Sequence, residues 1–160
     1  MIRGLGPWGL AFSVCGCAEA LPPGETCAAP AEISVTLASG LLLNPDESGE
    51  PLPTEIRVHE LRDVALFEQA MFEDAWLAEG ELGAAIVSTQ SVTLYPGESA
   101  ALTLTPSTEA HALAGVAIVR RPAGRTWRVI VPIETLPCGA TASLALRVDE
   151  YRIERAPEVR

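Results

Sequence analysis

Short runs in which apolar and polar residues alternate one by one dominate the chain after residue 31. Such alternation puts every second side chain on the same face, which is typical of a β-strand with one buried and one exposed face. The runs predict strands at residues 32–37, 55–59, 91–94, 101–104, 127–133 and 144–148, the last continuing toward 153. Residues 115–119 are apolar throughout and predict a central strand covered on both faces.

One segment follows a different period. From Asp63 to about residue 79, apolar residues recur at helical spacing, with Phe67, Met71 and Ala75 four positions apart. Asp63 is expected to cap the start of this helical insertion and Gly80 to end it, as one helix or two short ones. About seven strands with one helical insertion favour an all-β antiparallel β-sandwich, over residues 31–160, rather than an α/β fold.

Composition and charge narrow the classes of partner. The 160 residues are 48% hydrophobic, which is enough for one domain with a sizeable core. The formal net charge is −10, and all eleven basic residues are arginines. This charge repels phosphate backbones and leaves no basic patch for anionic lipid headgroups, so nucleic-acid binding is excluded as a function. No apolar run reaches the roughly 18–20 residues of a transmembrane helix.

The N-terminal residues 1–16 have the layout of a secretory signal peptide. Arg3 supplies a positive charge, residues 5–14 are mostly apolar, and small residues follow. Two cysteines then occur at positions 15 and 17, a spacing that also suits a metal ligand pair. A zinc site needs four ligands, however, and no CxxC or histidine pair lies nearby to complete one. We therefore predict no metal site.

The sequence VCGC at residues 14–17 resembles the lipobox of bacterial lipoproteins, an aliphatic residue and two small ones before a cysteine. The resemblance implies cleavage after Gly16 and lipid attachment to Cys17, where several acyl chains give stable anchoring. The residue after this cysteine is Ala18 rather than aspartate, which resembles lipoproteins that are sent to the outer membrane. Residues 17–30, rich in Pro, Ala and Gly, are then a lipidated tether to the domain.

Two further cysteines, Cys27 and Cys138, are candidates for a disulfide. The signal peptide implies an oxidising compartment, where such a bond is chemically permitted. Two separate thiols remain the alternative, because a sequence does not supply the Cα distance that a disulfide requires.

The sequence offers little catalytic chemistry. His59 and His111, the chain's two histidines, lie outside any ligand-spaced motif, and we expect both to be solvated. No G-x-S-x-G, P-loop or GxGxxG motif occurs. Residues 44–50 carry oxygens that suit calcium but lack the loop pattern of a dedicated site, so a solvated turn is the better interpretation. We expect a protein without cofactors that is not an enzyme.

A succession of short motifs points to a particular family. The motifs occupy residues 41–46 (LLLNPD), 53–61 (PTEIRVHEL), 66–67, 71–72, 81–83, 94–98 (LYPGE), 115–120 and 127–128. Their order over residues 31–133 resembles the TssJ or SciN family, the outer-membrane lipoprotein of the bacterial type VI secretion system. The resemblance implies a transthyretin-like β-sandwich on the periplasmic face of the outer membrane. It also implies a scaffold that holds the periplasmic domain of the large inner-membrane component of this system.

The resemblance further implies that the loop between the first two strands, residues 39–53, contacts that partner. The candidate contact residues are Leu41, Leu42, Leu43, Asn44, Pro45 and Asp46. Three consecutive leucines do not all face the core of one strand, so at least one is exposed or covered by something else. Alternatively, they continue the first strand and pack under the helix.

A rival hypothesis is a surface-tethered β-sandwich that binds a carbohydrate or a peptide. Such a module would need an exposed aromatic platform, but aromatic residues make up only 5% of the chain. The alternation around Trp127 also predicts that this side chain points into the core. The secretion-system lipoprotein is therefore the favoured interpretation.

Overall fold

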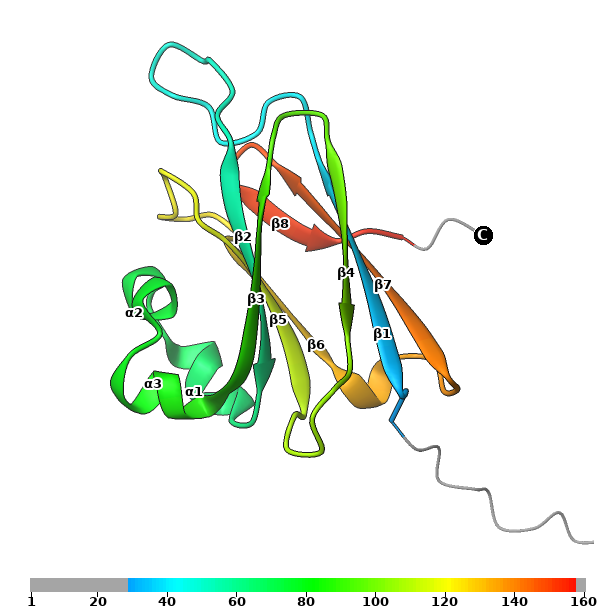
Figure 1. The fold of residues 1–160 in the computed structure, drawn as a ribbon. Coiled ribbons are helices and arrows are strands. Elements are labelled where there is room, and N and C mark those ends of the chain that lie inside the picture. The colour runs from blue at the N-terminus through cyan, green and yellow to red at the C-terminus, as the bar shows by residue number, and fades with distance from the viewer. Residues whose placement is uncertain (1–28, 158–160) are drawn as a thin grey trace, which may run out of the picture.

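The computed structural model describes residues 29–157 (Figure 1). Over this range the chain forms eight β-strands, three short α-helices and one 3₁₀ helix. In chain order they are β1 Glu32–Ser39, β2 Thr54–Leu61, α1 Val64–Gln69, α2 Phe72–Leu77, α3 Gly80–Ala85, β3 Ile86–Leu94, β4 Ser99–Leu104, β5 Ala112–Ala117, β6 Arg128–Pro132, η1 Ile133–Thr135, β7 Thr141–Asp149 and β8 Arg152–Arg155.

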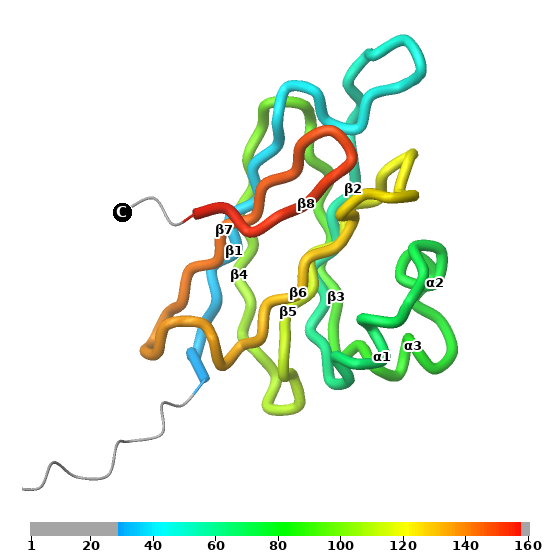
Figure 2. The backbone as a smooth tube through the Cα atoms, turned by 180° about the vertical axis from the view of Figure 1, so that it is seen from behind, coloured from blue at the N-terminus to red at the C-terminus, as the bar shows by residue number. Residues whose placement is uncertain are grey.

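The strands form two four-stranded sheets that pack face to face (Figures 1 and 2). The first sheet has the order β4-β1-β7-β8 and the second the order β3-β2-β5-β6. Neighbouring strands are antiparallel except β1 and β7, which run parallel. A short turn joins the edge strands β3 and β4, and at the opposite edge the backbone N–H of Ile153 donates to Thr126 O at 2.7 Å. The predicted β-sandwich with a helical insertion is confirmed.

The main core lies between the two sheets. It contains the alternate residues of the strands, which are buried as the period-two pattern predicts: Ile33, Val35, Leu37, Ile56, Val58, Leu144, Leu146, Val148 and Ile153. β5 is buried along its whole length, as predicted for a strand covered on both faces. Gly115 lies in its middle, and a Cβ there would come within 2.8 Å of Leu146 Cδ1. A glycine at this position therefore allows the sheets to approach closely.

The helices α1–α3, residues 64–85, form a lobe that we call the helical lobe. They cover the outer face of the β3-β2-β5-β6 sheet, where Phe67, Ala75, Leu82 and Ala85 pack in a second apolar cluster with residues of β2 and β5 (Figure 2). The predicted N-cap is confirmed, because Asp63 Oδ1 accepts from Leu66 N at 2.9 Å. The predicted end of the insertion at Gly80 is wrong, since this residue begins α3. The buried Leu82 and Ala85 extend the apolar contact with the sheet and so favour a third helix.

Candidate functional site

The loop between β1 and β2, residues 40–53, lies at one end of the sandwich (Figure 1). The chain enters the domain at the other end, where residues 29–31 precede β1. Two of the three consecutive leucines are open to solvent, with Leu41 77% and Leu42 54% exposed. Leu43 is fully buried and belongs to the main core. The leucines therefore divide into two surface residues and one anchor.

Asn44, the next residue, also holds the loop in place. It is buried and has a left-handed backbone with φ 43°. Its backbone N–H donates to Glu150 O at 2.7 Å, and its Oδ1 accepts from Arg120 N at 2.9 Å. Asparagine tolerates positive φ better than most residues and can hydrogen-bond through its side chain at the same time. Leu43 and Asn44, which the sequence includes among the candidate contacts, thus hold the loop against two neighbouring loops and do not form its surface.

The tip of the loop is a tight turn around Asp46. Its Oδ1 accepts hydrogen bonds from Ser48 N at 2.8 Å, Ser48 Oγ at 2.7 Å and Glu50 N at 2.9 Å. These bonds, that from the Ser48 hydroxyl first, hold the pKa of the Asp46 carboxyl below its usual value. Behind the tip, the Tyr151 hydroxyl donates to Pro45 O at 2.7 Å. The acidic tip therefore has a defined shape.

Leu41, directly before Leu42, lies next to the turn between β3 and β4. Ser39 Oγ donates to Tyr95 O at 2.6 Å, and Gly97 N donates to Gly40 O at 3.2 Å, so the two segments are joined. Leu41 Cδ2 lies 3.0 Å from where a Cβ on Gly97 would be. Tyr95 is itself 53% exposed. We call the surface formed by Leu41, Leu42 and Tyr95 the loop-end patch.

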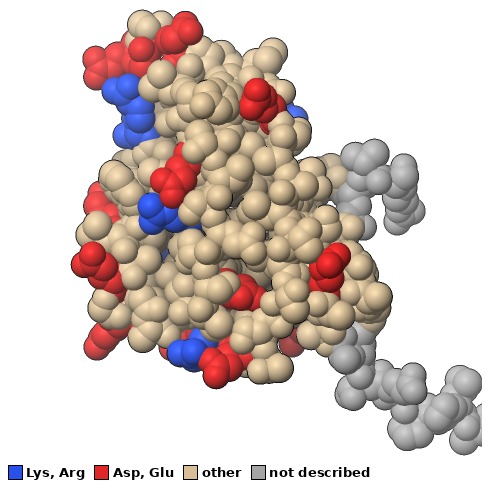
Figure 3. All heavy atoms as spheres, viewed as in Figure 1, with Lys and Arg blue, Asp and Glu red and all other residues tan. Residues whose placement is uncertain are grey.

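Charged residues of both signs surround this end of the molecule. Asp46, Glu47 and Glu50 lie in the β1–β2 loop, and Arg120, Arg121 and Arg125 lie in the neighbouring β5–β6 loop. Figure 3 shows acidic side chains at the end of the molecule with basic ones directly beside them. The guanidinium carbons of Arg121 and Arg125 lie 5.9 and 5.8 Å from the centre of the Tyr151 ring. An apolar centre with a charged rim is typical of a protein-binding surface.

His59 occupies a different place from the one predicted. It points to the outer face of its sheet, but the helical lobe covers that face and leaves the residue 0% exposed. Its Nδ1 lies 2.8 Å from Thr89 Oγ1, and its ring centre lies 5.6 Å from that of Phe67. Burial, and next the positive charge of Arg57, lower the pKa of His59 to about 4. The prediction of a solvated histidine is wrong for His59; His111 is exposed as predicted.

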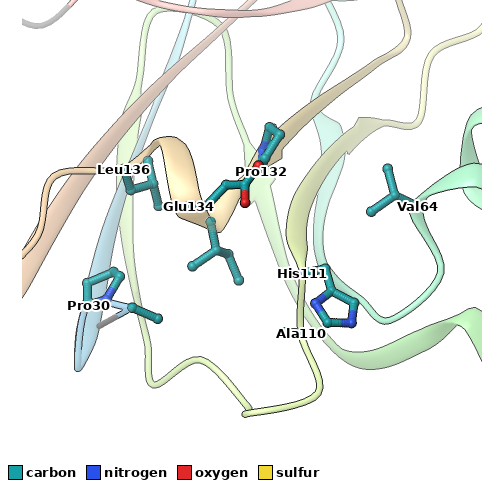
Figure 4. Close-up of a pocket in the computed structure, with 9 residues that line it drawn as sticks. Pro30, Val64, Ala110, His111, Pro132, Glu134 and Leu136 are labelled. Atoms are coloured by element: carbon teal, nitrogen blue, oxygen red, sulfur yellow. The ribbon is translucent and has the colours of Figure 1, made fainter. Parts of the chain in front are cut away.

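A cavity of about 540 Å³ opens at the opposite end of the sandwich, beside the first described residues (Figure 4). It is lined by Ala29, Pro30, Val64, Ala110, His111, Pro132, Ile133, Glu134 and Leu136. His111 and Glu134 are its titratable groups, and no nucleophilic side chain accompanies them. Across residues 29–157 no group of three or more His, Cys, Asp or Glu side chains is arranged to hold a metal ion.

The predicted lipid-attachment residue Cys17, the signal peptide at 1–16 and Cys27 lie outside the described residues. Cys138 is disulfide-bonded, and its predicted pairing with Cys27 stays a prediction. Among residues 29–157, none of the helices is long and apolar enough to span a membrane.

The fold defines a class, a β-sandwich with a helical insertion. The model of the family T6SS-SciN, described as type VI secretion lipoprotein, VasD, EvfM, TssJ, matches residues 31–151. The chain belongs to this family of type VI secretion lipoproteins, which is not a class of enzymes. Among curated proteins, none matches the sequence closely enough to count as a relative.

Solved structures give the same architecture. The T6SS lipoprotein TssJ1 from Pseudomonas aeruginosa is 25% identical, with a TM-score of 0.71 over 82% of this chain and 98% of that one. Serratia marcescens Lip, a membrane-bound component of the type VI secretion system, is 21% identical, with a TM-score of 0.73 over 81% and 100%. A chain in a structure described as the T6SS protein TssM C-terminal domain from EAEC is 20% identical, with a TM-score of 0.70 over 79% and 98%.

Proposed function

We propose that this protein is the outer-membrane lipoprotein of a type VI secretion trans-envelope complex and acts there as a scaffold without catalytic turnover. Lipid on Cys17 would hold it to the periplasmic face of the membrane, and the loop-end patch would bind the periplasmic C-terminal domain of the TssM-type inner-membrane component. Membership of the family supports this role. The likeness to a chain in the structure of the TssM C-terminal domain from EAEC supports the choice of partner.

One observation carries the proposal, the position of the loop-end patch at the end of β1. This strand starts directly after residues 29–31 and leads to Leu41 and Leu42. Eight residues of strand span about 26 Å, so the patch is held away from the anchored end of the domain. A lipoprotein that must reach across the periplasm needs its binding surface on the side that faces away from its membrane.

The energetic centre of the proposed interface is Leu41 and Leu42. Interfaces concentrate their binding energy in a few apolar anchors that become buried, while charged rims contribute less. Both leucines are exposed on a loop whose base is fixed by Leu43 and Asn44. Little ordering of the loop is needed on binding, which reduces the entropic cost of association.

The rival hypothesis of a carbohydrate-binding module finds less support. Such a site needs neighbouring exposed aromatic rings, but the exposed large aromatic residues among 29–157 are Trp76 on α2 and Tyr95 in the β3–β4 turn. Figure 1 shows these elements in different parts of the molecule. They do not form one platform.

The test is the affinity of the full chain for the purified periplasmic domain of the TssM-type partner. Leu42→Ala should weaken binding by about 1–3 kcal/mol, roughly 5- to 150-fold, with little change in the free energy of unfolding. Leu77→Ala is the matched control, because Leu77 is similarly exposed, at 62%, but lies on α2. Equal affinity of wild type and Leu42→Ala, or an equal loss in Leu77→Ala, would show that the loop-end patch is not the binding site.

A further inference from the structure

The helical lobe carries a second exposed apolar surface. Met71, Trp76 and Leu77 are 67%, 47% and 62% exposed, and they lie on α2 or at its N-cap. The other large apolar side chains that are exposed within residues 29–157 are Leu41, Leu42 and Tyr95 of the loop-end patch. A single exposed leucine needs no explanation, but three such residues within positions 71–77 make this part of the lobe a candidate interaction site.

A groove of about 590 Å³ runs between the three helices. Leu66, Ala70, Leu77 and Leu82 supply its apolar walls. The rest of its lining is polar: Gln69, Asp74, Glu79, Gly80 and Glu81. The groove is large enough to take one or two apolar side chains of another protein, although it is too open to enclose a small ligand.

The charge of the lobe is entirely negative. Residues 63–85 include Asp63, Glu68, Glu73, Asp74, Glu79 and Glu81 and contain no arginine, and the whole chain contains no lysine. Of these carboxylates, Asp74, Glu79 and Glu81 line the groove, and none of the three forms an ion pair with any residue from 29 to 157. Their negative potential is therefore available to a ligand of opposite charge.

The arginines that contact the helices are engaged with their backbone carbonyls. Arg62 donates to Ala84 O in α3 at 3.2 Å and pairs with Glu109. Arg57 donates to Trp76 O in the last turn of α2. Arg128 donates to Phe67 O at 3.0 Å and to Ala70 O at 2.7 Å, at the C-terminal end of α1. Cations are favoured at helix C-termini, where carbonyl groups lack partners within the helix. These hydrogen bonds hold the helices against the sheet, so the groove is preformed. Because these arginines bind backbone carbonyl groups, they do not neutralise the carboxylates of the groove.

From this combination we infer that the groove of the helical lobe binds a cationic amphipathic segment of a partner protein. Apolar side chains of the segment would enter between Leu66, Leu77 and Leu82, and lysines or arginines would pair with the carboxylates of the rim. The helical lobe of a second copy of the chain is a poor occupant, because it would bring five further acidic residues against the five of the first lobe. The groove is separate from the loop-end patch, and the inference does not depend on the proposed function.

The inference is tested with a defined probe and the full chain. The probe is a fluorescein-labelled leucine/lysine peptide of about four helical turns, and its counterpart has glutamate in place of each lysine. Fluorescence anisotropy should detect binding of the leucine/lysine peptide and none of the leucine/glutamate peptide. Leu77→Ser should weaken that binding at least about fivefold, because it removes an apolar wall. The double variant Glu79→Gln/Glu81→Gln should weaken it roughly two- to fivefold and reduce its dependence on salt.

Leu42→Ser is the matched control, since it removes a similarly exposed leucine from the loop-end patch and should leave peptide affinity unchanged. Equal weakening by Leu42→Ser and Leu77→Ser would attribute binding to exposed apolar side chains in general, and no weakening by Leu77→Ser would attribute it to the net charge of the protein; either result would overturn the inference. Equal binding of both peptides would also overturn it, because the rim would then play no part. A full-chain dimer in sedimentation that Leu77→Ser dissociates would assign the groove to a second copy instead.

Discussion

Acidification is predicted to destabilise the fold through one side chain, His59. This residue is 0% exposed beneath the helical lobe, where its Nδ1 faces Thr89 Oγ1 and its ring packs near Phe67. Among residues 29–157 its Nε2 has no hydrogen-bond partner, so a proton bound there would be buried without one. Burial and the nearby positive charge of Arg57 lower the pKa of His59 from 6.5 to about 4.

The direction of the effect follows from this difference in pKa. Below pH 6.5 the unfolded chain binds a proton on His59 while the folded chain keeps the ring neutral, so protons favour unfolding. The stabilisation that neutral His59 provides is complete above pH 6.5 and is lost as the pH falls toward about 4. At about 1.4 kcal/mol per pKa unit, the total loss is about 3 kcal/mol, of which about 2 kcal/mol falls between pH 7 and pH 5.

Urea unfolding of the full chain at pH 7, 6 and 5 measures this loss. His59→Asn provides the comparison, because asparagine keeps a polar atom near Thr89 but does not ionise. The variant should be less stable than wild type at pH 7, since it leaves a cavity beside Phe67, but should lose about 2 kcal/mol less between pH 7 and pH 5. His111→Asn is the matched control, because His111 is exposed and its replacement should leave the pH dependence of wild type intact.

Parallel stability curves for wild type and His59→Asn between pH 7 and pH 5 would refute the reasoning. They would mean that His59 titrates alike in the folded and unfolded chain, and hence that the helical lobe does not exclude water from it. A loss of pH dependence in His111→Asn would equally refute it, because the titration would then belong to the other histidine.

Two further predictions concern Leu43 at the base of the β1–β2 loop and the lipid-attachment residue Cys17. Leu43→Ala should cost roughly 2–5 kcal/mol of folding stability in urea unfolding, because Leu43 is fully buried in the main core; a loss below about 1 kcal/mol would contradict its role as the anchor of the loop. Cys17→Ser should abolish incorporation of a fatty-acid analogue, since the thioether to lipid needs the thiol; equal labelling of wild type and variant would reject Cys17 as the attachment site.

Much of the fold could be predicted from the sequence, because period-two alternation records which side chains share a face of a strand. It identified the buried faces of β1 and β7 and the fully covered β5. Alternation does not record what covers the outer face of a sheet. The alternation therefore predicts a solvated His59, which is wrong. Leu61 on the same face of β2 and the alanines on the outer face of β5 are the signals that this face is covered.

The candidate site, too, depends on contacts that the local sequence does not reveal. The run of three leucines indicated that at least one is exposed, but not which one. Hydrogen bonds fix which leucine is buried: Arg120 N donates to Asn44 Oδ1, and Asn44 N donates to Glu150 O, and both partners are far away in the sequence. Local propensity contains no information about such contacts. The patch also needs Tyr95, which joins the leucines only because the β3–β4 turn lies beside β1.

The proposed scaffold role would place a load between the two ends of the molecule. β1 begins where the chain enters the domain and ends at the loop-end patch, and it is paired with β7 on one side and β4 on the other. Its register with β7 runs from Glu32 to Ser39 without a break. A force between the N-terminal end and the loop would act along this strand and load its hydrogen bonds to both neighbouring strands. The central position of β1 is therefore the feature of the fold that matches the proposed scaffold role most directly.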